Sequence, residues 1–276
     1  MALIQMTYLS MALLRTVEVQ VILPVDKMNI GTDAQKEKRY KTLYLLHGLL
    51  GSNVDWISGT CIQRWAEARN LAVVMPSGEN SFYFDHTQPN SAYGTFIGQE
   101  LPGMMRKTFP LSARREDTFI GGLSMGGYGA MRNGLKYCDT FSHIIALSGA
   151  FHIFEEKGHG LFGGLACFGD KKKAEKTDLN PKIAFENARE KGRVPRIYMS
   201  CGLEDGLLTA NRKLKEFFET QGTELTYVET AGGHDWDFWN SQIHDALDWL
   251  PLDEESHGVS SGHVTEKPHT PEKSTQ

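Results

Sequence analysis

The chain alternates short apolar runs with longer amphipathic stretches, and this pattern restricts the possible folds more than any other feature of the sequence. Runs such as LAVVM at 71–75 and HIIAL at 143–147 are apolar on consecutive residues, which suits strands covered on both faces. Strands are expected over residues 42–46, 71–75, 118–121, 143–147, 196–200 and 225–229. Helices are expected between them, over residues 63–69, 95–109, 126–136, 207–221 and 238–249. This alternation predicts an α/β fold with a mostly parallel, doubly wound sheet.

The first residues are predicted to add an antiparallel hairpin at one edge of that sheet. Residues 1–14 are uncharged, and residues 16–23 then alternate polar and apolar side chains as a strand does. A secretory signal peptide is the alternative, but the segment has no basic start and polar residues interrupt it. The hairpin is therefore our preferred interpretation.

Two further segments stand apart from the strand–helix rhythm. Residues 150–194 separate two predicted strands and mix glycines with aromatics, which favours a small cap insertion within the main domain. Residues 253–276 hold five acids, two lysines and no aromatic residue. Such a segment cannot bury enough apolar surface to order itself. We expect one α/β domain over residues 1–252, followed by a disordered polar tail.

Composition excludes several classes of protein. The chain has 29 basic and 34 acidic residues, so it lacks the positive charge that nucleic-acid binding needs. No apolar run is long enough to span a membrane, so no membrane partner is expected. The four cysteines form no CxxC pair, which argues against a zinc ribbon or a disulfide framework, and no metal site is expected. Reduced thiols and the missing export signal favour a cytoplasmic location.

A nucleophile motif follows one of the predicted strands. Gly122-Leu-Ser124-Met-Gly126 fits G-x-S-x-G, with a strand before it and a helix after it, as this motif requires. We expect the sharp turn to hold Ser124 in a strained conformation and to expose its Oγ. The flanking residues crowd together there, so both must be glycine. The alternative is a glycine-rich turn with an ordinary serine.

Two backbone N–H groups are predicted to form an oxyanion hole near this serine. One belongs to Met125, the residue after the nucleophile. The other belongs to Leu49, in the turn His47-Gly48-Leu49 that ends an early strand. We expect His47 to support this loop without taking part in the chemistry.

A carboxylate and a histidine follow the last two predicted strands. Asp205 and Glu204 compete for the carboxylate role, and the Asp-Gly turn at 205–206 favours Asp205. His234 follows two glycines and precedes a helix. The chain order Ser124, Asp205, His234 matches the nucleophile-elbow hydrolases. His234 would act as general base, Ser124 would form an acyl-enzyme, and this mechanism needs no cofactor.

Several motifs in the same order resemble the esterase D-like α/β hydrolase family, most closely the bacterial tributyrin esterases. The stretches that carry the resemblance are LYLLHGLLGSNVDW, LAVVMPSGENSFYFD, GQELPGMMRKTFP, FIGGLSMGGYGAMR, CGLEDGLL and AGGHDWDFW. The resemblance implies an α/β-hydrolase fold and carboxylesterase activity on short acyl chains. It also implies a triad of Ser124, Asp205 and His234, oxyanion donors at Leu49 and Met125, and homo-oligomers in some members.

The substrate is less constrained than the chemistry. Trp56, Tyr83 and Trp236 are predicted to line the pocket for a small-molecule ester, although each could equally be an ordinary core or surface aromatic. The alternatives are acyl transfer, a thioesterase like S-formylglutathione hydrolase, a feruloyl or acetyl-xylan esterase, and a catalytically silent binding module. The sequence HGLLGS lacks the cysteine that formylglutathione enzymes tend to carry after the oxyanion glycine, which disfavours the thioesterase.

Overall fold

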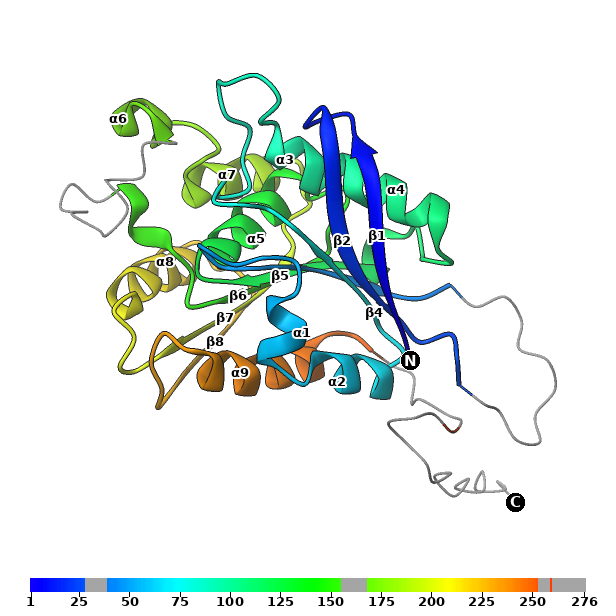
Figure 1. The fold of residues 1–276 in the computed structure, drawn as a ribbon. Coiled ribbons are helices and arrows are strands. Elements are labelled where there is room, and N and C mark those ends of the chain that lie inside the picture. Colours follow the sequence, from blue (N-terminus) through cyan, green and yellow to red (C-terminus); the bar gives the residue numbers. More distant parts are fainter. Residues whose placement is uncertain (28–38, 155–167, 253–258, 260–276) are drawn as a thin grey trace, which may run out of the picture.

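The computed structural model describes residues 1–27, 39–154, 168–252 and 259. These residues contain an eight-stranded sheet with the strand order β1-β2-β4-β3-β5-β6-β7-β8 (Figure 1). The strands are β1 (Ala2–Ser10), β2 (Arg15–Leu23), β3 (Thr42–Leu46), β4 (Ala72–Pro76), β5 (Thr118–Leu123), β6 (His143–Leu147), β7 (Arg196–Gly202) and β8 (Leu225–Thr230). The predicted α/β fold is confirmed.

The N-terminal hairpin forms one edge of the sheet, as predicted. β1 pairs antiparallel with β2 from Ala2 opposite Leu23 to Ser10 opposite Arg15. β2 then pairs antiparallel with β4, and every pairing from β4 to β8 is parallel. The carboxyl ends of the parallel strands therefore meet along one side of the sheet, where ligands bind in open α/β folds.

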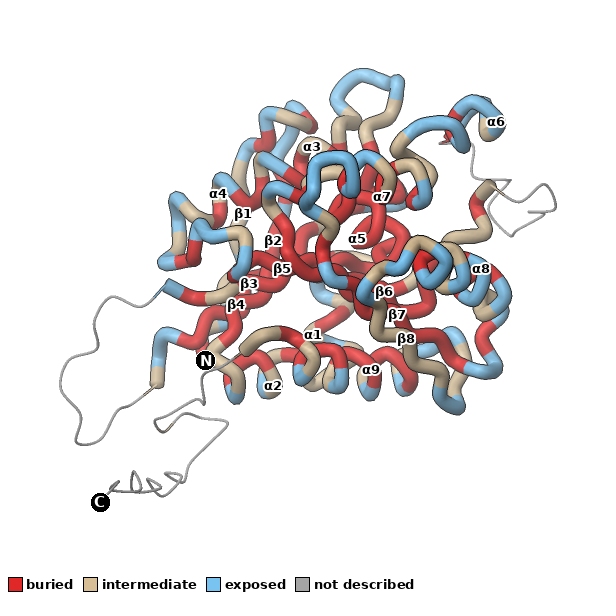
Figure 2. Tube along the Cα trace, turned by 180° about the vertical axis from the view of Figure 1, so that it is seen from behind, coloured by how far each residue is buried: buried red, intermediate tan, exposed pale blue. Residues whose placement is uncertain are grey.

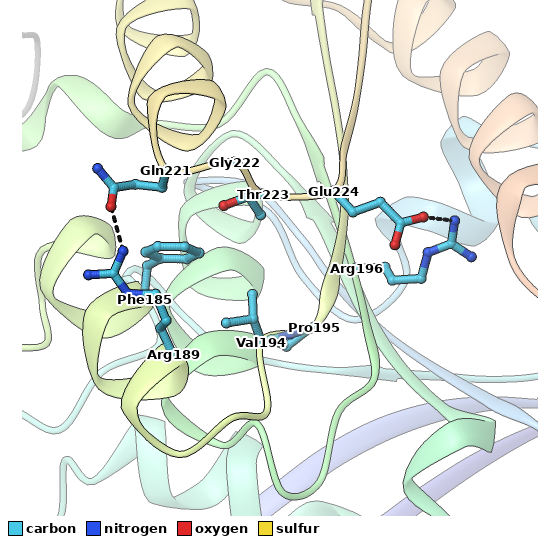
Figure 3. A pocket seen from close by; sticks show the side chains of 9 residues that line it. All are labelled: Phe185, Arg189, Val194, Pro195, Arg196, Gln221, Gly222, Thr223 and Glu224. Carbon is cyan, nitrogen blue, oxygen red and sulfur yellow. Dashed lines mark hydrogen bonds and ion pairs between the residues drawn. The ribbon is translucent and has the colours of Figure 1, made fainter.

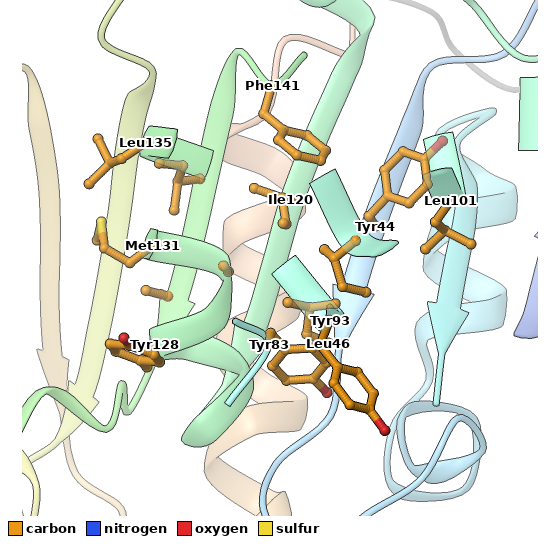
Figure 4. Close-up of a cluster of buried hydrophobic side chains, with 14 of the residues drawn as sticks. Tyr44, Leu46, Tyr83, Tyr93, Leu101, Ile120, Tyr128, Met131, Leu135 and Phe141 are labelled. Atoms are coloured by element: carbon orange, nitrogen blue, oxygen red, sulfur yellow. The ribbon is translucent and has the colours of Figure 1, made fainter. Parts of the chain in front are cut away.

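Helices cover both faces of the sheet (Figure 1). They are α1 (Asp55–Gly59), α2 (Ile62–Ala68), α3 (Tyr93–Thr95), α4 (Leu101–Thr108), α5 (Met125–Lys136), α6 (Lys171–Ala174), α7 (Pro181–Glu190), α8 (Leu208–Thr220) and α9 (Trp236–Trp249). One core, with Trp56 and Ile243, lies between the sheet and helices α1, α2 and α9. The other, with Met131 and Leu214, lies on the opposite face (Figure 4). Figure 2 shows that the strands between these layers are buried.

The helix predicted over 95–109 is interrupted. A π-helical turn (Phe96–Glu100) joins α3 to α4, and Pro102 lies in the first turn of α4. Proline has no N–H to donate to the carbonyl four residues earlier, so a regular α-helical ladder cannot run through this point. The expected helix is therefore three consecutive helical segments.

The described part of the predicted cap lies against α5. The Asp178 carboxylate accepts from Arg132 at 3.1 Å and Lys136 at 2.9 Å, and the Tyr128 hydroxyl donates to the Leu179 carbonyl at 2.6 Å. Residues 155–167 lie outside the described part of the chain, so the cap at 150–194 stays a prediction. The predicted disordered tail at 253–276 also lies outside it, apart from Val259. No helix among the described residues has the length and apolarity needed to cross a bilayer.

Candidate active site

Ser124 lies in the sharp turn between β5 and α5. Its backbone has φ 53° and ψ −116°, a conformation that is strained for any residue except glycine. A Cβ on Gly122 would approach the backbone of Gly126 to 2.5 Å, and a Cβ on Gly126 would approach the Leu46 carbonyl oxygen to 2.4 Å. These contacts are with backbone atoms that cannot move aside. The turn therefore requires glycine on both sides of Ser124.

Three side chains from separate loops form a hydrogen-bonded chain at the carboxyl ends of the strands. The Asp205 carboxylate, after β7, is 2.9 Å from His234 Nδ1. His234, after β8, places Nε2 3.0 Å from the Ser124 hydroxyl oxygen. The Asp205 side chain is 0% exposed and that of His234 is 36% exposed. A buried carboxylate thus orients an imidazole whose far nitrogen reaches a hydroxyl facing solvent.

The surroundings of Asp205 keep its carboxylate charged. Burial raises its pKa, but hydrogen bonds from His234, the Leu207 N–H and the Ser148 hydroxyl outweigh burial, and the net pKa lies below the ordinary value of 3.8. The Leu207 N–H donates to Oδ1 at 2.8 Å, while His234 contacts Oδ2. Both oxygens are therefore held in place.

Glu204 has a different position from Asp205. Its Oε2 accepts from the Gly232 N–H at 2.6 Å, and its own N–H donates to the Gly232 carbonyl at 3.1 Å. These two bonds connect the loop after β7 to the loop that carries His234. The sequence left both acids as candidates for the carboxylate that orients His234. In the structure Asp205 contacts the imidazole, whereas Glu204 forms hydrogen bonds with the neighbouring backbone.

The loop after β3 lies directly beside Ser124. A Cβ on Gly48 would be 3.6 Å from the Ser124 Cβ and 2.7 Å from Leu123 Cδ1. His47 Nε2 accepts from the Gly78 N–H at 2.9 Å, so the proton is on Nδ1, which donates to the Gly48 carbonyl at 2.7 Å. Burial lowers the pKa of His47, which keeps the ring neutral.

This loop and the start of α5 offer two backbone donors near Ser124. Within the described residues, neither the Leu49 N–H nor the Met125 N–H has a hydrogen-bond acceptor. Met125 is the first residue of α5, so its N–H has no partner within the helix. The helix N-terminus also contributes a positive partial charge there. Both groups can therefore donate hydrogen bonds to a developing oxyanion.

The sequence of this chain is similar to those of known esterases. Residues 10–250 match the family described as "Putative esterase". An acetyl esterase from Caldicellulosiruptor saccharolyticus is 42% identical over 268 residues, covering 91% of this chain and 98% of the relative. The chain belongs to the putative esterase family. It is a carboxylic ester hydrolase.

Solved structures agree with this assignment. The fluorophosphonate-binding serine hydrolase FphF of Staphylococcus aureus has a TM-score of 0.81 and 28% identity, and covers 92% of the esterase and 99% of its own chain. The S-formylglutathione hydrolase FrmB of the same organism has a TM-score of 0.78 and 28% identity, covering 90% and 98%.

The aromatics predicted to line the substrate pocket lie in different places. Trp56 and Tyr83 are fully buried. The Trp56 indole donates to the Leu46 carbonyl at 3.0 Å, and the Tyr83 hydroxyl donates to the His47 carbonyl at 2.9 Å. Both support the loop after β3 and have no free surface for substrate, which differs from our expectation. Trp236 is half-buried beside Trp56 and can still contact substrate.

Sequence reasoning missed two residues that contact the triad. Ser148 follows β6 with φ 49° and is completely buried. Trp239 in α9 donates to the Ser148 hydroxyl at 3.2 Å and places its ring edge-to-face with His234, with centroids 4.9 Å apart. The position of Ser148 at a strand's carboxyl end was a usable signal, but nothing in the sequence showed which side chain it would meet.

A hollow of about 280 Å³ lies at the opposite end of the sheet from the triad, before β7 and β8 (Figure 3). Phe185 and Val194 line it, and Arg189 donates to Gln221 at 2.6 Å across its rim. Arg196 forms an ion pair with Glu224. Each charged group at this hollow thus has a partner within it, Arg189 the Gln221 amide and Arg196 the Glu224 carboxylate. The described residues also contain no group of three His, Cys, Asp or Glu side chains able to hold a metal ion.

Proposed function

We propose that the protein is a serine carboxylesterase that hydrolyses short-chain acyl esters through an acyl-enzyme intermediate. The observation that carries the proposal is the hydrogen-bonded chain from Asp205 through His234 to the Ser124 hydroxyl. A nucleophile, a base in contact with it and a buried carboxylate that orients the base are the three parts that acyl transfer to serine requires.

In the first half of the reaction, His234 Nε2 takes the Ser124 proton while Oγ bonds to the ester carbonyl carbon. The Leu49 and Met125 N–H groups stabilise the negative charge on the former carbonyl oxygen. The ester C–O bond then breaks, and His234 returns the proton to the departing alcohol. Water next attacks the acyl-enzyme with His234 again as base, which releases the carboxylic acid and restores Ser124.

The proposed acyl group is short, with acetyl as the first choice. Support comes from the acetyl esterase that is 42% identical over nearly all of both chains. A preference for tributyrin, which the resemblance to tributyrin esterases implied, falls within the same proposal because butyryl is also a short chain. Trp236 is the proposed substrate contact among the predicted aromatics.

Thioester hydrolysis is the second candidate. The likeness to an S-formylglutathione hydrolase at a TM-score of 0.78 favours it. The sequence Gly48-Leu-Leu-Gly51 at the loop after β3 disfavours it, since the cysteine of formylglutathione enzymes is missing there.

The test is a rate series on p-nitrophenyl acetate, butyrate, octanoate and feruloyl esters, with S-formylglutathione as the thioester. We expect acetate or butyrate to give the highest kcat/KM, and an octanoate or feruloyl optimum would contradict the acyl-chain assignment. Ser124→Ala should abolish both hydrolysis and fluorophosphonate labelling. Ser200→Ala, which removes a buried hydroxyl outside the site, is the matched control and should retain both. Turnover by the Ser124→Ala enzyme would overturn the proposal.

A further inference from the structure

A second layer of hydrogen bonds lies behind the Asp205 carboxylate. Ser148 and Trp239 come from the β6 loop and from α9, and neither has a role in the mechanism above. The Trp239 indole N–H donates to the Ser148 oxygen at 3.2 Å. An indole N–H can only donate, so the Ser148 hydroxyl proton remains available for another acceptor.

The Asp205 carboxylate lies within reach of that proton, as does the Cys201 thiol. The hydrogen bond from Ser148 is one of the contacts that lower the pKa of Asp205. Cys201 lies beside the same two groups, and burial raises its pKa to about 12, so it stays a neutral thiol. Ser148 thus supplies a hydroxyl donor to a fully buried carboxylate.

The backbone at Ser148 adopts a conformation that a side chain disfavours. Its φ of 49° is unfavourable for a residue with a side chain, and the loop holds it there through a bond from its N–H to the Ser200 carbonyl at 2.8 Å. Glycine would remove the strain but would also remove the hydroxyl. Strained positions of this kind persist where the surrounding structure over-determines them, often at active sites.

Trp239 links this layer to the base as well. Its ring is edge-to-face with the His234 imidazole, with centroids 4.9 Å apart and planes at 86°. One side chain therefore contacts both His234 and the donor to Asp205. We propose that Ser148 and Trp239 are positioning residues that hold the Asp205–His234 pair in its reactive orientation. This inference rests on the proposed serine esterase function.

The experiment compares four variants on a short acyl ester over a range of pH. Ser148→Ala should lower kcat/KM about tenfold, the effect of losing one hydrogen bond to a charged group, with KM little changed. Trp239→Phe keeps the ring over His234 and loses the N–H, so a fall of roughly threefold is expected. Ser148→Gly removes the hydroxyl without backbone strain, which keeps the test valid if the alanine variant folds poorly. Ser200→Ala is the control, because it removes a buried hydroxyl on β7 that has no hydrogen-bond partner among the described residues.

The pH profile separates positioning from a merely structural role. Without the Ser148 donor the Asp205 charge is less neutralised and stabilises the protonated imidazole more strongly. The acidic limb of kcat/KM should therefore move to higher pH in both Ser148 variants and stay in place in Ser200→Ala. Rates within twofold of the parent enzyme and an unmoved limb would overturn the inference. If Ser124→Ala stays active, the proposed function itself fails, which is a distinguishable result.

A different observation concerns the free edge of β1. From Leu3 to Leu9 the strand pairs with β2 on one side, and within the described residues no other strand pairs with it. The whole strand is uncharged and contains neither proline nor glycine. Leu3 and Leu9 are 45% and 61% exposed. Natural sheet edges are normally protected by charge, proline or a bulge, and an unprotected apolar edge tends to pair with another strand.

The opposite edge of the sheet is protected in this way. Glu229 in β8 forms an ion pair with Arg212 at 2.6 Å, and Glu224 just before β8 pairs with Arg196. The two edges of one sheet therefore differ in charge. β1 is therefore the edge without charged residues.

The sequence of β1 is complementary to itself. When two copies run antiparallel with Met6 opposite Met6, Leu3 lies opposite Leu9, Ile4 opposite Tyr8, and Gln5 opposite Thr7. Every pair between Leu3 and Leu9 then joins apolar to apolar or polar to polar on the same face. We propose that a second copy of this chain binds β1 in this register and makes a two-fold dimer with one continuous sheet.

Size-exclusion chromatography coupled to light scattering tests the dimer. The parent chain has a mass of 30.9 kDa, and the eluting species should have twice that mass. Leu9→Lys should give monomers, and so should Leu3→Glu. The double variant Leu3→Glu/Leu9→Lys places opposite charges across each pair and should restore the dimer. Thr226→Lys on β8 is the control and should leave the dimer intact. A monomeric parent chain, or a double variant that stays monomeric, would overturn the proposed register and interface.

Discussion

The two ends of the parallel sheet are built differently. At the carboxyl ends, residues with side chains adopt positive φ after successive strands, with Leu50 after β3, Tyr83 after β4, Ser124 after β5 and Ser148 after β6. At the amino ends, charged groups are paired with each other, as Arg196 is with Glu224. Positive φ angles thus follow four successive strands at the end where the triad lies, and ion pairs such as Arg196–Glu224 lie at the other end. Strain of this kind is retained at functional sites and compensated elsewhere.

The largest expected effect tests the carboxyl end directly. Asp205→Asn keeps the shape of the side chain but removes the charge that orients and stabilises His234. We expect kcat/KM on a short acyl ester to fall by about 10⁴-fold at neutral pH, as in other triads, with the fold intact by circular dichroism. Glu204→Gln is the matched control, since Glu204 contacts backbone only, and a comparable loss there would contradict the assignment of roles.

Gly126→Ala tests the geometry of the turn. The added Cβ would meet the Leu46 carbonyl oxygen at 2.4 Å, so Ser124 and the β3 loop must move apart. A displacement of about 1 Å typically costs on the order of 10²-fold in rate. Steady-state kinetics would check this. Gly103→Ala in α4 meets nothing within 4 Å and should leave activity unchanged while stabilising the helix by about 0.5–1 kcal/mol.

Substitutions at the amino ends of the strands should change the free energy of unfolding and leave kcat/KM unchanged. Burial raises the pKa of Asp117, but bonds from Arg114 and Ser112 outweigh it and leave the pKa below 3.8. A depressed pKa stabilises the fold above the unfolded value, and this stabilisation is lost as pH falls through the folded value. Asp117→Asn should therefore cost about 1–2 kcal/mol near neutral pH, and the difference should shrink as the pH falls below the ordinary value of 3.8 and through the lowered pKa of the folded protein. Urea unfolding at several pH values measures it, and an equal deficit at all pH values would contradict the ionic explanation.

The smallest effect is expected at the exposed Arg196–Glu224 pair. Both side chains are about half exposed or more, so solvent screens their attraction. Arg196→Gln should change the free energy of unfolding by less than about 0.5 kcal/mol and leave kcat/KM unchanged. A clear loss of activity would mean that the two ends of the sheet are coupled. It would contradict the assignment of catalysis to the carboxyl end alone.

Much of this arrangement could be predicted from the sequence, because the local pattern of apolar and polar residues matches the part that each strand has in the sheet. The consecutive apolar runs predicted the parallel strands, and alternation at 16–23 predicted the edge hairpin. The residues placed in the hydrogen-bonded chain came from three strand ends, since parallel topology brings those ends together. The π-helical turn at Phe96–Glu100 was missed because the spacing of apolar residues does not show where the hydrogen-bonding pattern of a helix changes over a single turn.

Side-chain contacts between distant segments were the part that the sequence could not supply. Trp56 and Tyr83 were expected at the substrate, yet each packs inward and donates to a backbone carbonyl. Ser148 and Trp239 meet across 91 residues, and no local pattern marks that pair. Aromatic residues suit a pocket wall and a core equally well, so composition alone does not decide between them.

The pairing of β3 with β5 has a consequence for how this site can change over time. Leu46 lies opposite Gly122, and the two proposed oxyanion donors, Leu49 and Met125, each follow three residues later. Shifting one strand by two residues would leave every side chain on the same face of the sheet. It would also move one oxyanion donor by roughly 7 Å relative to the other. Such a slipped variant could keep its buried interior and lose its oxyanion hole. Insertions within these two strands would thus be selected against because they lower turnover, even where the protein still folds. Insertions in the outer loops would not move the donors and would be tolerated.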